Sequence, residues 1–372
     1  MKAGWEIKEF EDCLEKVVYT KKIKRKSFLA NGEYPIISQE KNLINGYWNN
    51  VADLFEVKIP VVIFGDHTQV LKFIDFSFVL GADGVKILQP KKDIEPKYFY
   101  YYLKNVNLSS LGYARHYRLL KEIEVHYPKP LPEQQRIVAI LDKAFAAISK
   151  AKDNAEKNLI NTKALFGSYL QNIFQNKGKD WEEKALGDVS EITSKLIDPK
   201  KDEYQNLVHI GAGNIESKKG TLVDLKTAKE EKLISGKFLF DENMVLYSKI
   251  RPYLMKVVKC NFKGLCSADI YPLMPVVNEI TQDFLYYLLL SDNFTEYAIH
   301  GSQRAGMPKV NRKHLFDYEF SCPTIKEQQA IVKKLDALST ETKRLEAIYR
   351  QKLEDLEELK KSILQKAFEG EL

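Results

Sequence analysis

The order of apolar and polar positions is repeated in two stretches of the chain. Residues 131–174 and 325–368 align without a gap, at a constant offset of 194 residues. Both stretches open with the motif EQQ-x-I-V-x-x-L-D, which begins at Glu133 and Glu327, and both close with S-x-L-Q-x-x-F. An internal duplication of this length indicates that one structural unit occurs twice.

Both repeated stretches are predicted to form long helices. In the second copy, apolar residues follow a four-and-three spacing that is typical of coiled coils, at Leu338, Leu345, Tyr349, Leu356, Leu359 and Ile363. The first copy carries a thinner series of Phe145, Ile148, Ala151, Ala155, Leu159, Leu165 and Tyr169. Two ordinary core helices are the alternative interpretation, but stretches of about 40 residues far exceed the mean helix length of ~11–12.

A segment of mixed α and β character precedes each long helix. In the first segment, β-branched and aromatic runs predict strands at 17–24, 34–38, 61–65, 72–81, 84–89 and 122–127, with a helix at 96–105. In the second, the same signals predict strands at 206–210, 244–250, 254–260, 265–275 and 318–320, with a helix at 283–299. The chain therefore alternates globule, helix, globule, helix.

The duplication extends into the globules. Trp5 and Trp181 open the two copies at an offset of 176, so about 18 residues have been added inside the second copy, and the polar stretches 200–204 and 214–224 could hold part of them. If the entrance and exit of each globule lie close together, the two helices must run antiparallel. We therefore predict an α+β fold with two mixed α/β domains in pseudo-twofold tandem, joined by two long antiparallel coiled-coil helices. The predicted boundaries are 1–129, 130–177, 178–322 and 323–372.

Composition and charge narrow the class of protein. Hydrophobic residues make up 44% of the chain, which is ample for buried cores, and the net charge is +6. Residues 1–176 hold 26 Lys and Arg against 20 Asp and Glu, and the remainder holds 31 of each. The four cysteines form no CxxC pair, and no apolar run approaches the ~20 residues of a membrane span. These features predict a cytoplasmic protein with no membrane partner.

The sequence offers no catalytic or metal-binding motif. It contains no phosphate-binding GxxxxGK[ST] loop, no HExxH and no paired Cys/His spacing, and its six histidines are scattered. The Asn/Asp-Pro-Pro-Tyr/Phe tetrad of adenine methyltransferases is also missing. We predict a chain without catalytic residues, metal or cofactor.

The repeated motifs carry a resemblance to a known family. The two EQQ-x-I-V-x-x-L-D helix starts, the S-x-L-Q-x-x-F helix ends, and the segments GADGVKIL (81–88) and YSKIRPYL (247–254) resemble the specificity (S) subunits of type I restriction–modification systems. This resemblance implies two target recognition domains, each reading one half of a bipartite target in double-stranded DNA. It also implies that the helices set the gap between the halves and dock two modification (methyltransferase) subunits, in a complex with restriction/translocase subunits.

Candidate DNA-contact residues come from polar, Gly-punctuated segments before each globule's last strand. These are Arg115, His116 and Arg118 in the first globule, and Gln303, Arg304 and Lys309 in the second. Secondary candidates are Gln39, Tyr47, Trp48, His67, Lys249 and Arg251. A solvated connector is the alternative interpretation of the first two segments, and a core anchor is the alternative for Trp48.

Candidate partner-binding residues lie at the starts of the two long helices. They are Glu133, Gln134, Glu327, Gln328 and Leu335, and Ile140 and Phe368 are further apolar residues expected on the outer faces. A competing hypothesis is a non-catalytic, two-headed coiled-coil scaffold that binds proteins rather than DNA. The near-neutral second globule favours that alternative.

Overall fold

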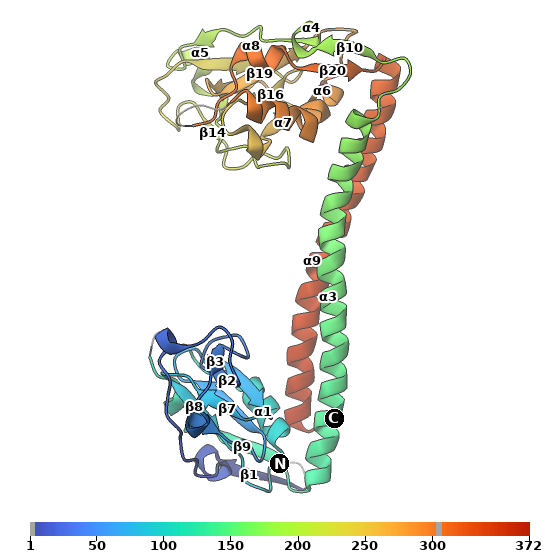
Figure 1. The fold of residues 1–372 in the computed structure, drawn as a ribbon. Helices are drawn as coiled ribbons and strands as arrows, with labels where there is room; N and C mark the ends of the chain where they lie inside the picture. Colours follow the sequence, from blue (N-terminus) through green and yellow to red (C-terminus); the bar gives the residue numbers. More distant parts are fainter. Residues whose placement is uncertain (1–3, 113, 303–306) are drawn as a thin grey trace. The chain divides into compact units, whose positions relative to one another are not determined.

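The structure is a computed structural model, which describes residues 4–112, 114–302 and 307–372 (Figure 1). The chain divides into two compact units. The first contains Met1–Glu156 together with Arg350–Leu372, and the second contains Lys157–Tyr349. Each unit therefore holds one globule, the start of one long helix and the end of the other.

The first globule contains two sheets and one strand pair. Its elements are β1 (Trp5–Glu9), β2 (Tyr34–Ile37), β3 (Gly46–Trp48), β4 (Leu54–Phe55), β5 (Val61–Gly65), β6 (Leu71–Ile74), β7 (Phe78–Leu80), β8 (Val85–Leu88), α1 (Pro96–Asn105), α2 (Tyr117–Leu120) and β9 (Glu124–Pro128). The strand orders are β3-β2-β7-β4 and β6-β5-β8, and β1 pairs with β9. Strand β5 is buried along its whole length, as expected for the centre of a sheet covered on both faces.

The second globule repeats this plan with additions. Its elements are β10 (Glu182–Ala185), α4 (Leu186–Val189), β11 (Ser190–Glu191), β12 (Leu196–Ile197), α5 (Asp202–Gln205), β13 (Val208–Ile210), β14 (Lys226–Thr227), β15 (Lys237–Phe240), β16 (Val245–Ser248), β17 (Val257–Lys259), β18 (Gly264–Ser267), β19 (Ile270–Pro275), α6 (Gln282–Leu289), α7 (Asp292–His300), α8 (Arg312–Phe316) and β20 (Glu319–Cys322). The strand orders are β14-β13-β18-β15-β12 and β17-β16-β19-β11, and β10 pairs with β20.

The sheets show the duplication more clearly than the sequence does. In both globules one parallel pair, β2 with β7 and β13 with β18, lies among antiparallel pairs. The offset between the starts of equivalent elements is 174 at β13, 184 at β16, 186 at α6 and 194 at α9. The added residues therefore lie between β13 and β16, where 214–224 is found, and around α7. The stretch 200–204 holds none of them, because the offset has not risen by β13.

The entrance and exit of each globule are adjacent, which was the condition for antiparallel helices. Strand β1 pairs with β9 from Trp5 opposite Pro128, and β10 pairs with β20 from Glu182 opposite Cys322. The first residues of a globule are thus hydrogen-bonded to its last residues. The long helix then starts directly at this closure.

The two long helices are α3 (Leu131–Gln175) and α9 (Ile325–Glu369). Within the first unit they run antiparallel, because Arg136 donates to the Leu372 carbonyl at 2.7 Å and Lys152 pairs with Glu357 at 2.6 Å. Within the second unit, Leu170 near the end of α3 shares a core with Leu335 near the start of α9. The predicted α+β fold with two mixed domains and two long helices is confirmed; the pseudo-twofold relation between domains and the four boundaries stay predictions.

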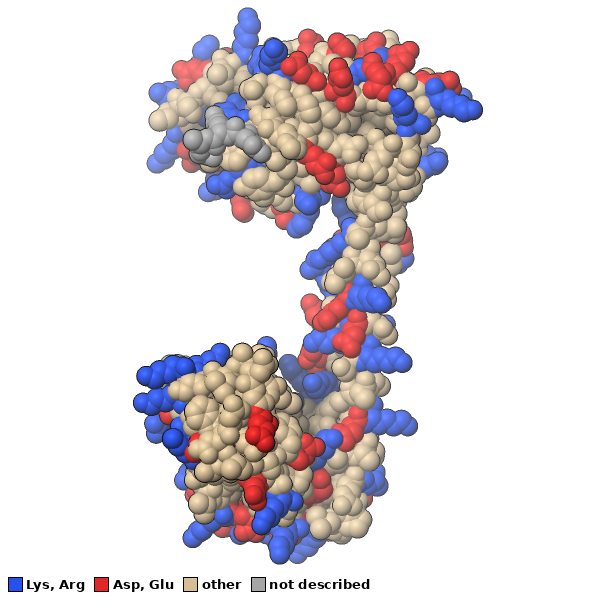
Figure 2. All heavy atoms as spheres, in the orientation of Figure 1, with Lys and Arg blue, Asp and Glu red and all other residues tan. Residues whose placement is uncertain are grey.

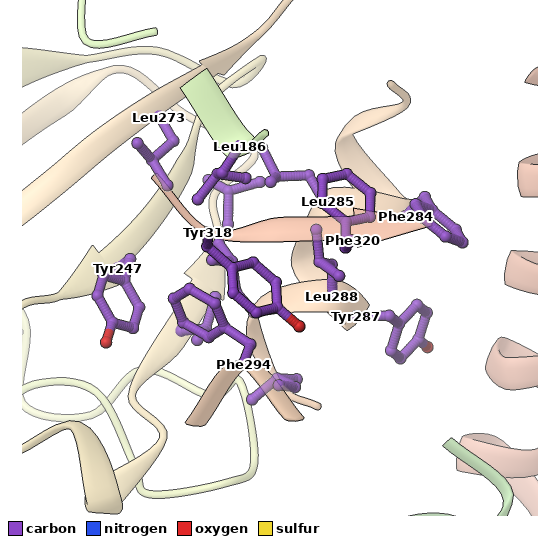
Figure 3. Close-up of a cluster of buried hydrophobic side chains, with 14 of the residues drawn as sticks. Leu186, Tyr247, Leu273, Phe284, Leu285, Tyr287, Leu288, Phe294, Tyr318 and Phe320 are labelled. Carbon is purple, nitrogen blue, oxygen red and sulfur yellow. The ribbon is translucent and has the colours of Figure 1, made fainter. Parts of the chain in front are cut away.

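Each globule's core includes the end of the helix that arrives from the other half of the sequence. In the first unit, Phe368 packs edge-on against Tyr98 and Tyr102 at centroid distances of 5.3 and 5.2 Å. In the second, Phe174 contacts Phe284 at 5.5 Å. Figure 3 shows the aromatic and leucine side chains of the second core, where Phe294, Tyr318 and Phe320 meet between α6, α7 and β20. The two S-x-L-Q-x-x-F motifs are therefore core-filling motifs.

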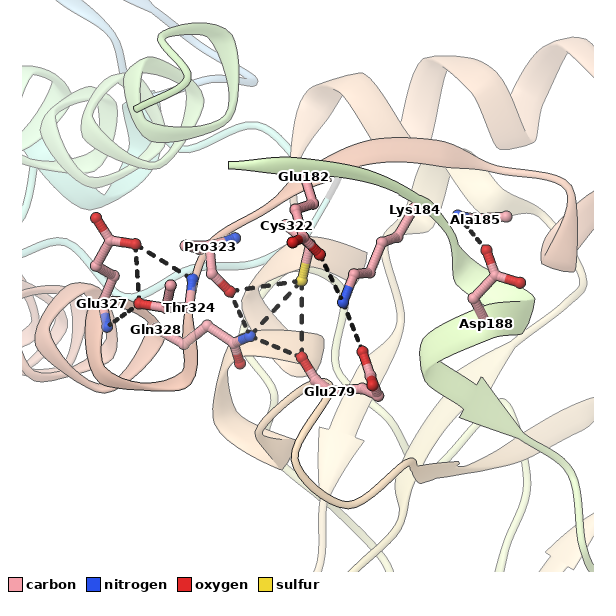
Figure 4. Close-up of polar contacts among 10 residues, drawn as sticks. All are labelled: Glu182, Lys184, Ala185, Asp188, Glu279, Cys322, Pro323, Thr324, Glu327 and Gln328. Carbon is pink, nitrogen blue, oxygen red and sulfur yellow. Dashed lines mark hydrogen bonds and ion pairs between the residues drawn. The ribbon is translucent and has the colours of Figure 1, made fainter. Parts of the chain in front are cut away.

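The EQQ motif is a hydrogen-bonded latch that ties each helix start to its globule. Gln328 is fully buried, and its Nε2 donates to the carbonyls of Glu279 and Pro323, both at 2.9 Å (Figure 4). Its Oε1 accepts from Thr281 N at 2.8 Å. Gln134 repeats the arrangement: it donates to Asp93 and Pro128 and accepts from Glu95 N. In each copy, the side-chain amide of one glutamine forms hydrogen bonds with three backbone groups.

The aspartate that closes the motif forms a second duplicated contact. The hydroxyl of Tyr101 donates to Asp142 at 2.5 Å, and that of Tyr287 donates to Asp336 at 2.5 Å. Burial and the carboxylate beside it both raise the pKa of each tyrosine, so the hydroxyls remain protonated donors. The motif therefore encodes attachment of helix to globule.

Several predicted elements are wrong in detail. The stretch 17–24 forms no strand; Ile23 makes a single bridge to Gly81 and Val18 is exposed. The predicted strands 72–81 and 265–275 are each two strands that belong to different sheets, and the predicted helix 283–299 is two helices, because Ser291 caps the second one. Leu165 and Leu359, expected in the helix seam, are about half exposed.

Candidate nucleic-acid interface

Four chain segments meet beside the β5 end in the first globule. They are the described residues of 38–45, 66–70, 81–84 and 111–117, which we call the first loop junction. Asp66 N donates to Gly84 O at 2.7 Å, and His116 N donates to Asp66 O at 2.7 Å. His67 N donates to the Gln39 side chain at 3.1 Å, and the Thr68 hydroxyl donates to the Gln39 carbonyl at 2.7 Å. Strand ends thus position loop residues through backbone contacts.

The second globule builds a second loop junction from 211–214, 249–256, 267–269 and 307–311. Lys249 N donates to Asp269 O at 3.0 Å, and Val310 N donates to Lys249 O at 2.8 Å. Lys249 therefore occupies the place of Asp66, the residue that directly follows the central strand. The same backbone frame is present in both globules.

The two junctions carry opposite charges at this shared position. The Asp66 carboxylate is buried and accepts from Tyr117 N at 2.8 Å. The Lys249 ammonium donates to the Ala268 carbonyl and lies 4.8 Å from the Tyr271 ring centroid. Burial and the neighbouring Lys309 lower the pKa of Lys249, and Lys309 itself pairs with Asp269 at 2.9 Å. The same backbone frame thus holds side chains of opposite charge, and both are engaged within their own globule.

The structure brings Gln39, His67, Arg115 and His116 to the first loop junction, and Arg118 lies next to it in the chain. Arg115 is exposed there, Gln39 and His67 are partly buried, and Arg118 is exposed on the adjoining helix α2. His116 is only 2% exposed: its Nδ1 lies 3.1 Å from Asp66 O, and its Nε2 accepts from Leu111 N at 3.0 Å. His116 therefore holds the segment in place and is not a surface contact, which corrects the prediction.

Tyr47 and Trp48 closely follow the 38–45 segment of the first loop junction in the chain. Both are on β3, where Tyr47 pairs through its backbone with Leu29. The Trp48 indole donates to the buried Asp53 carboxylate at 2.8 Å, so its polar edge is used inside the globule. Trp48 is thus a half-buried structural residue, as the alternative interpretation proposed.

In the second globule the structure brings three candidates together. Arg251 is exposed and has a left-handed φ of 50°, with its backbone N donating to Pro308 O at 2.9 Å. Lys309 is half-buried beside Asp269, and only 12% of the Lys249 side chain is exposed. Gln303 and Arg304 lie outside the described residues.

The candidate partner-binding residues divide into buried and exposed ones. Gln134, Gln328 and Leu335 are 0% exposed, and Phe368 is nearly buried, so none offers an outer surface. Glu133 pairs with Arg136 at 2.8 Å, and Glu327 accepts from both Thr324 N and its hydroxyl, as in a helix cap. The exposed large apolar side chains described for α3 and α9 are instead Leu131, Ile140, Ile160, Leu165, Ile348 and Leu359.

Sequence reasoning missed a buried lysine that supports the first loop junction. Lys72, on β6, is 4% exposed, and its ammonium donates to the carbonyls of Asn42 and Leu43 and to the Asn45 side chain at 2.5, 3.3 and 3.0 Å. Burial lowers the pKa of Lys72 to about 8. The alternation of residues 71–74 places Lys72 on an inward face, which was the available signal.

Replacing Lys72 with methionine is expected to loosen residues 39–45. The substitution keeps the volume but leaves three acceptors without their donor, a loss of roughly 1–3 kcal/mol in the local opening free energy. Hydrogen exchange measured by mass spectrometry should show faster exchange in this segment. The exposed neighbour Lys41→Met is the control, and equal exchange in both variants would contradict a supporting role for Lys72.

The described residues contain neither a candidate metal-binding group nor a helix fit to cross a membrane. Within 4–112, 114–302 and 307–372, no group of three His, Cys, Asp or Glu side chains could hold a metal ion. Over the same ranges, no helix combines the length and apolar character that a membrane crossing requires. The four cysteines are buried and unpaired.

The domain model described as "Type I restriction modification DNA specificity domain" matches the chain twice, over residues 2–158 and 178–355. These matches cover most of the chain, so it belongs to this family, the specificity subunits of type I restriction–modification systems. The two matches correspond to the two copies found in the sequence. The predicted resemblance is confirmed.

Individual relatives agree with this assignment. The chain is 33% identical to the EcoDI specificity subunit of Escherichia coli over 219 residues, which is 57% of this chain and 48% of that protein. The chain thus matches about half the length of this relative. It is 26% identical to the EcoR124I/EcoR124II specificity subunit of E. coli over 340 residues, covering 86% and 83%.

Two solved structures show the same fold. A chain from a structural study of assembly and conformational transition in the type I system aligns with a TM-score of 0.74 at 15% identity, covering 100% of this chain and 99% of that one. The HsdS subunit from Thermoanaerobacter tengcongensis aligns with a TM-score of 0.63 at 15% identity, covering 100% and 98%.

Proposed function

We propose that this chain is the non-catalytic DNA-addressing subunit of a type I restriction–modification complex. In this proposal each globule reads one half of a bipartite target in double-stranded DNA through its loop junction. The observation that carries the proposal is the repeated backbone frame with different side chains, Asp66 in one junction and Lys249 in the other. A shared frame suits two similar docking events, and different side chains suit two different base sequences.

The proposed roles of the long helices and of the partner subunits follow from membership of the family. The helices α3 and α9 set the gap between half-sites and dock two modification subunits, while restriction/translocase subunits complete the complex in the cytoplasm. The predicted domains 1–129 and 178–322 are the two recognition domains, and 130–177 and 323–372 are the spacers. Catalysis and its cofactors belong to the other subunits.

The distribution of charged side chains favours DNA contacts by individual basic residues. In the view of Figure 2, basic side chains are interspersed with acidic ones on both globules, and acidic side chains gather over β10 and α4. Phosphate contacts would come from individual exposed side chains at the junctions, such as Arg115 and Arg251. The affinity for DNA should therefore fall as the salt concentration rises.

Arg115→Ala and Arg251→Ala are expected to alter different half-sites. If each arginine donates to a guanine edge, its loss costs about 1–3 kcal/mol and relaxes only the half-site that its globule reads. Selection of bound duplexes from a randomised library, with the chain purified together with its modification subunits, measures both half-sites at once.

Two comparisons make this experiment decisive. Arg115→Lys and Arg251→Lys keep the charge, so they preserve a phosphate contact but lose bidentate reading of a guanine. If the arginines contact phosphates, the Ala variants should lower the salt slope by about one and the Lys variants should leave it unchanged. A wild-type complex that selects no sequence would refute the proposed function. Variants that each change both half-sites equally would refute one junction per half-site.

A further inference from the structure

A hollow opens in the second loop junction, next to its exposed arginine. Its volume is about 260 Å³, and its lining residues are Ala212, Gly213, Ile250, Arg251, Leu254, Lys256 and Met307. They come from three of the four junction segments. The side chains that form its walls are aliphatic or a thioether, apart from the two cationic ones.

The polar groups around this hollow are already engaged within the protein. The Leu254 carbonyl accepts from the Ser217 hydroxyl at 2.7 Å, and the Met255 carbonyl accepts from Lys218 N at 3.2 Å. The Lys256 ammonium donates to Ala212 O at 2.5 Å. An occupant would therefore meet mainly apolar surface, with little unsatisfied hydrogen-bonding capacity.

Backbone strain maintains the shape of the hollow. Arg251 and Met255, at the two ends of a 3-10 turn over Pro252–Leu254, both adopt left-handed φ values of 50° and 49°. Such conformations cost free energy in non-glycine residues and are concentrated at functional sites. The turn belongs to a connection, 249–256, that is longer than its counterpart 66–70 in the first globule.

The surroundings of the hollow identify the kind of occupant. Lys249, Arg251, Lys256 and Lys309 lie in the segments that form it, which favours a polyanion over an apolar protein segment. Within double-stranded DNA, thymine is the base that presents an apolar group, its C5 methyl, to the major groove, beside the O4 acceptor. An apolar hollow next to a guanidinium donor matches this pair of features.

We propose that the hollow bounded by Ile250, Leu254 and Met307 receives the C5 methyl of a thymine in the half-site read by the second globule. This inference rests on the proposed function and adds the identity of one base. The first globule's half-site carries no such expectation.

The test has two parts: one removes the C5 methyl group from the DNA, and the other fills the hollow in the protein. In the selected target, each thymidine of the second half-site is replaced singly by deoxyuridine, which lacks only the methyl. One replacement should weaken binding by the complete complex about fourfold, the effect of one buried methyl group. Replacements in the first half-site serve as the control.

Gly213→Leu is the matching protein change. A Cβ at Gly213 meets no atom within 4 Å, and the residue has no positive φ, so a larger side chain can enter the hollow. The variant should bind thymine and uracil targets equally. Met307→Ser, which removes an apolar wall instead, should also abolish the difference, and unchanged reading of the first half-site shows that either variant is folded.

The possible outcomes distinguish failure of the methyl pocket from failure of the proposed function on which it rests. A second half-site without thymine, uracil targets that bind as tightly as thymine targets, or a Gly213→Leu complex that keeps the full difference would each overturn the methyl pocket while leaving the proposed function intact. A complex that shows no sequence preference in either half-site would overturn both.

Discussion

Gln328→Ala is expected to destabilise the second unit by roughly 3 kcal/mol. The substitution leaves Thr281 N and the carbonyls of Glu279 and Pro323 without their buried partner, and each such loss costs about 1–3 kcal/mol before partial rescue by water. Gln134→Ala should do the same to the first unit. Urea unfolding of the full chain gives the free energies, and hydrogen exchange shows which unit is affected.

The chain supplies its own control for this result. Gln135 and Gln329 are the same residue type as the latch residues and directly follow them in the same helices, but they are exposed. Gln135→Ala and Gln329→Ala should change the unfolding free energy by less than about 0.5 kcal/mol. Equal effects of Gln328→Ala and Gln329→Ala would show that the buried amide does not anchor the helix.

Removing one heptad from both helices is expected to shorten the preferred gap between half-sites by about three base pairs. Seven residues span about 10 Å of helix, and three base-pair steps span about the same distance. The pairing of Lys152 with Glu357 gives the register, so residues 150–156 and 353–359 should be deleted together. Thr162 then takes the place of the buried Ala155, and Ile363 takes that of Leu356.

Library selection with the complete complex measures the new gap. Three base pairs also rotate one half-site against the other by about 100°, so the affinity at the new optimum should fall although both half-site sequences are retained. Deleting 150–156 alone, which mismatches the helices, should abolish selection of any single gap. A paired deletion that leaves the gap unchanged would mean that helix length does not determine it.

The architecture could be predicted from the sequence because the duplication is long and the helix pattern is strong. Strands β1 and β10 were missed, since WEIKE and EEKA are charged and contain no fully buried residue, whereas their partners β9 and β20 overlap the predicted strands 122–127 and 318–320. The run 72–81 was predicted as one strand because its composition is continuous, whereas residues 75–77 turn the chain into a second sheet. Local composition does not encode which sheet a strand joins.

The exposed loop positions were predicted correctly for Arg115 and Arg251, whereas the roles of the repeated glutamines were not. Arg115 and Arg251 were chosen as basic residues in loops, and both are exposed at the junctions. Gln134 and Gln328 were assigned to a partner surface because they recur, but they recur because each satisfies three backbone groups of its own globule. Repetition in sequence reports a shared constraint, and burial is needed to decide whether that constraint is folding or binding.

The exchange of helix ends between the two units has a consequence for biosynthesis. The core of the first unit contains Leu364, Ala367 and Phe368, which follow the whole second globule in the chain and are therefore synthesised after it. A nascent chain of the first globule and α3 therefore lacks part of its own core throughout synthesis of the second globule. Domains commonly fold in order as they emerge, at about 5–20 residues per second. Here the first unit receives its last core residues only after the second globule has been synthesised, so the contacts of Phe368 with Tyr98 and Tyr102 cannot form until then.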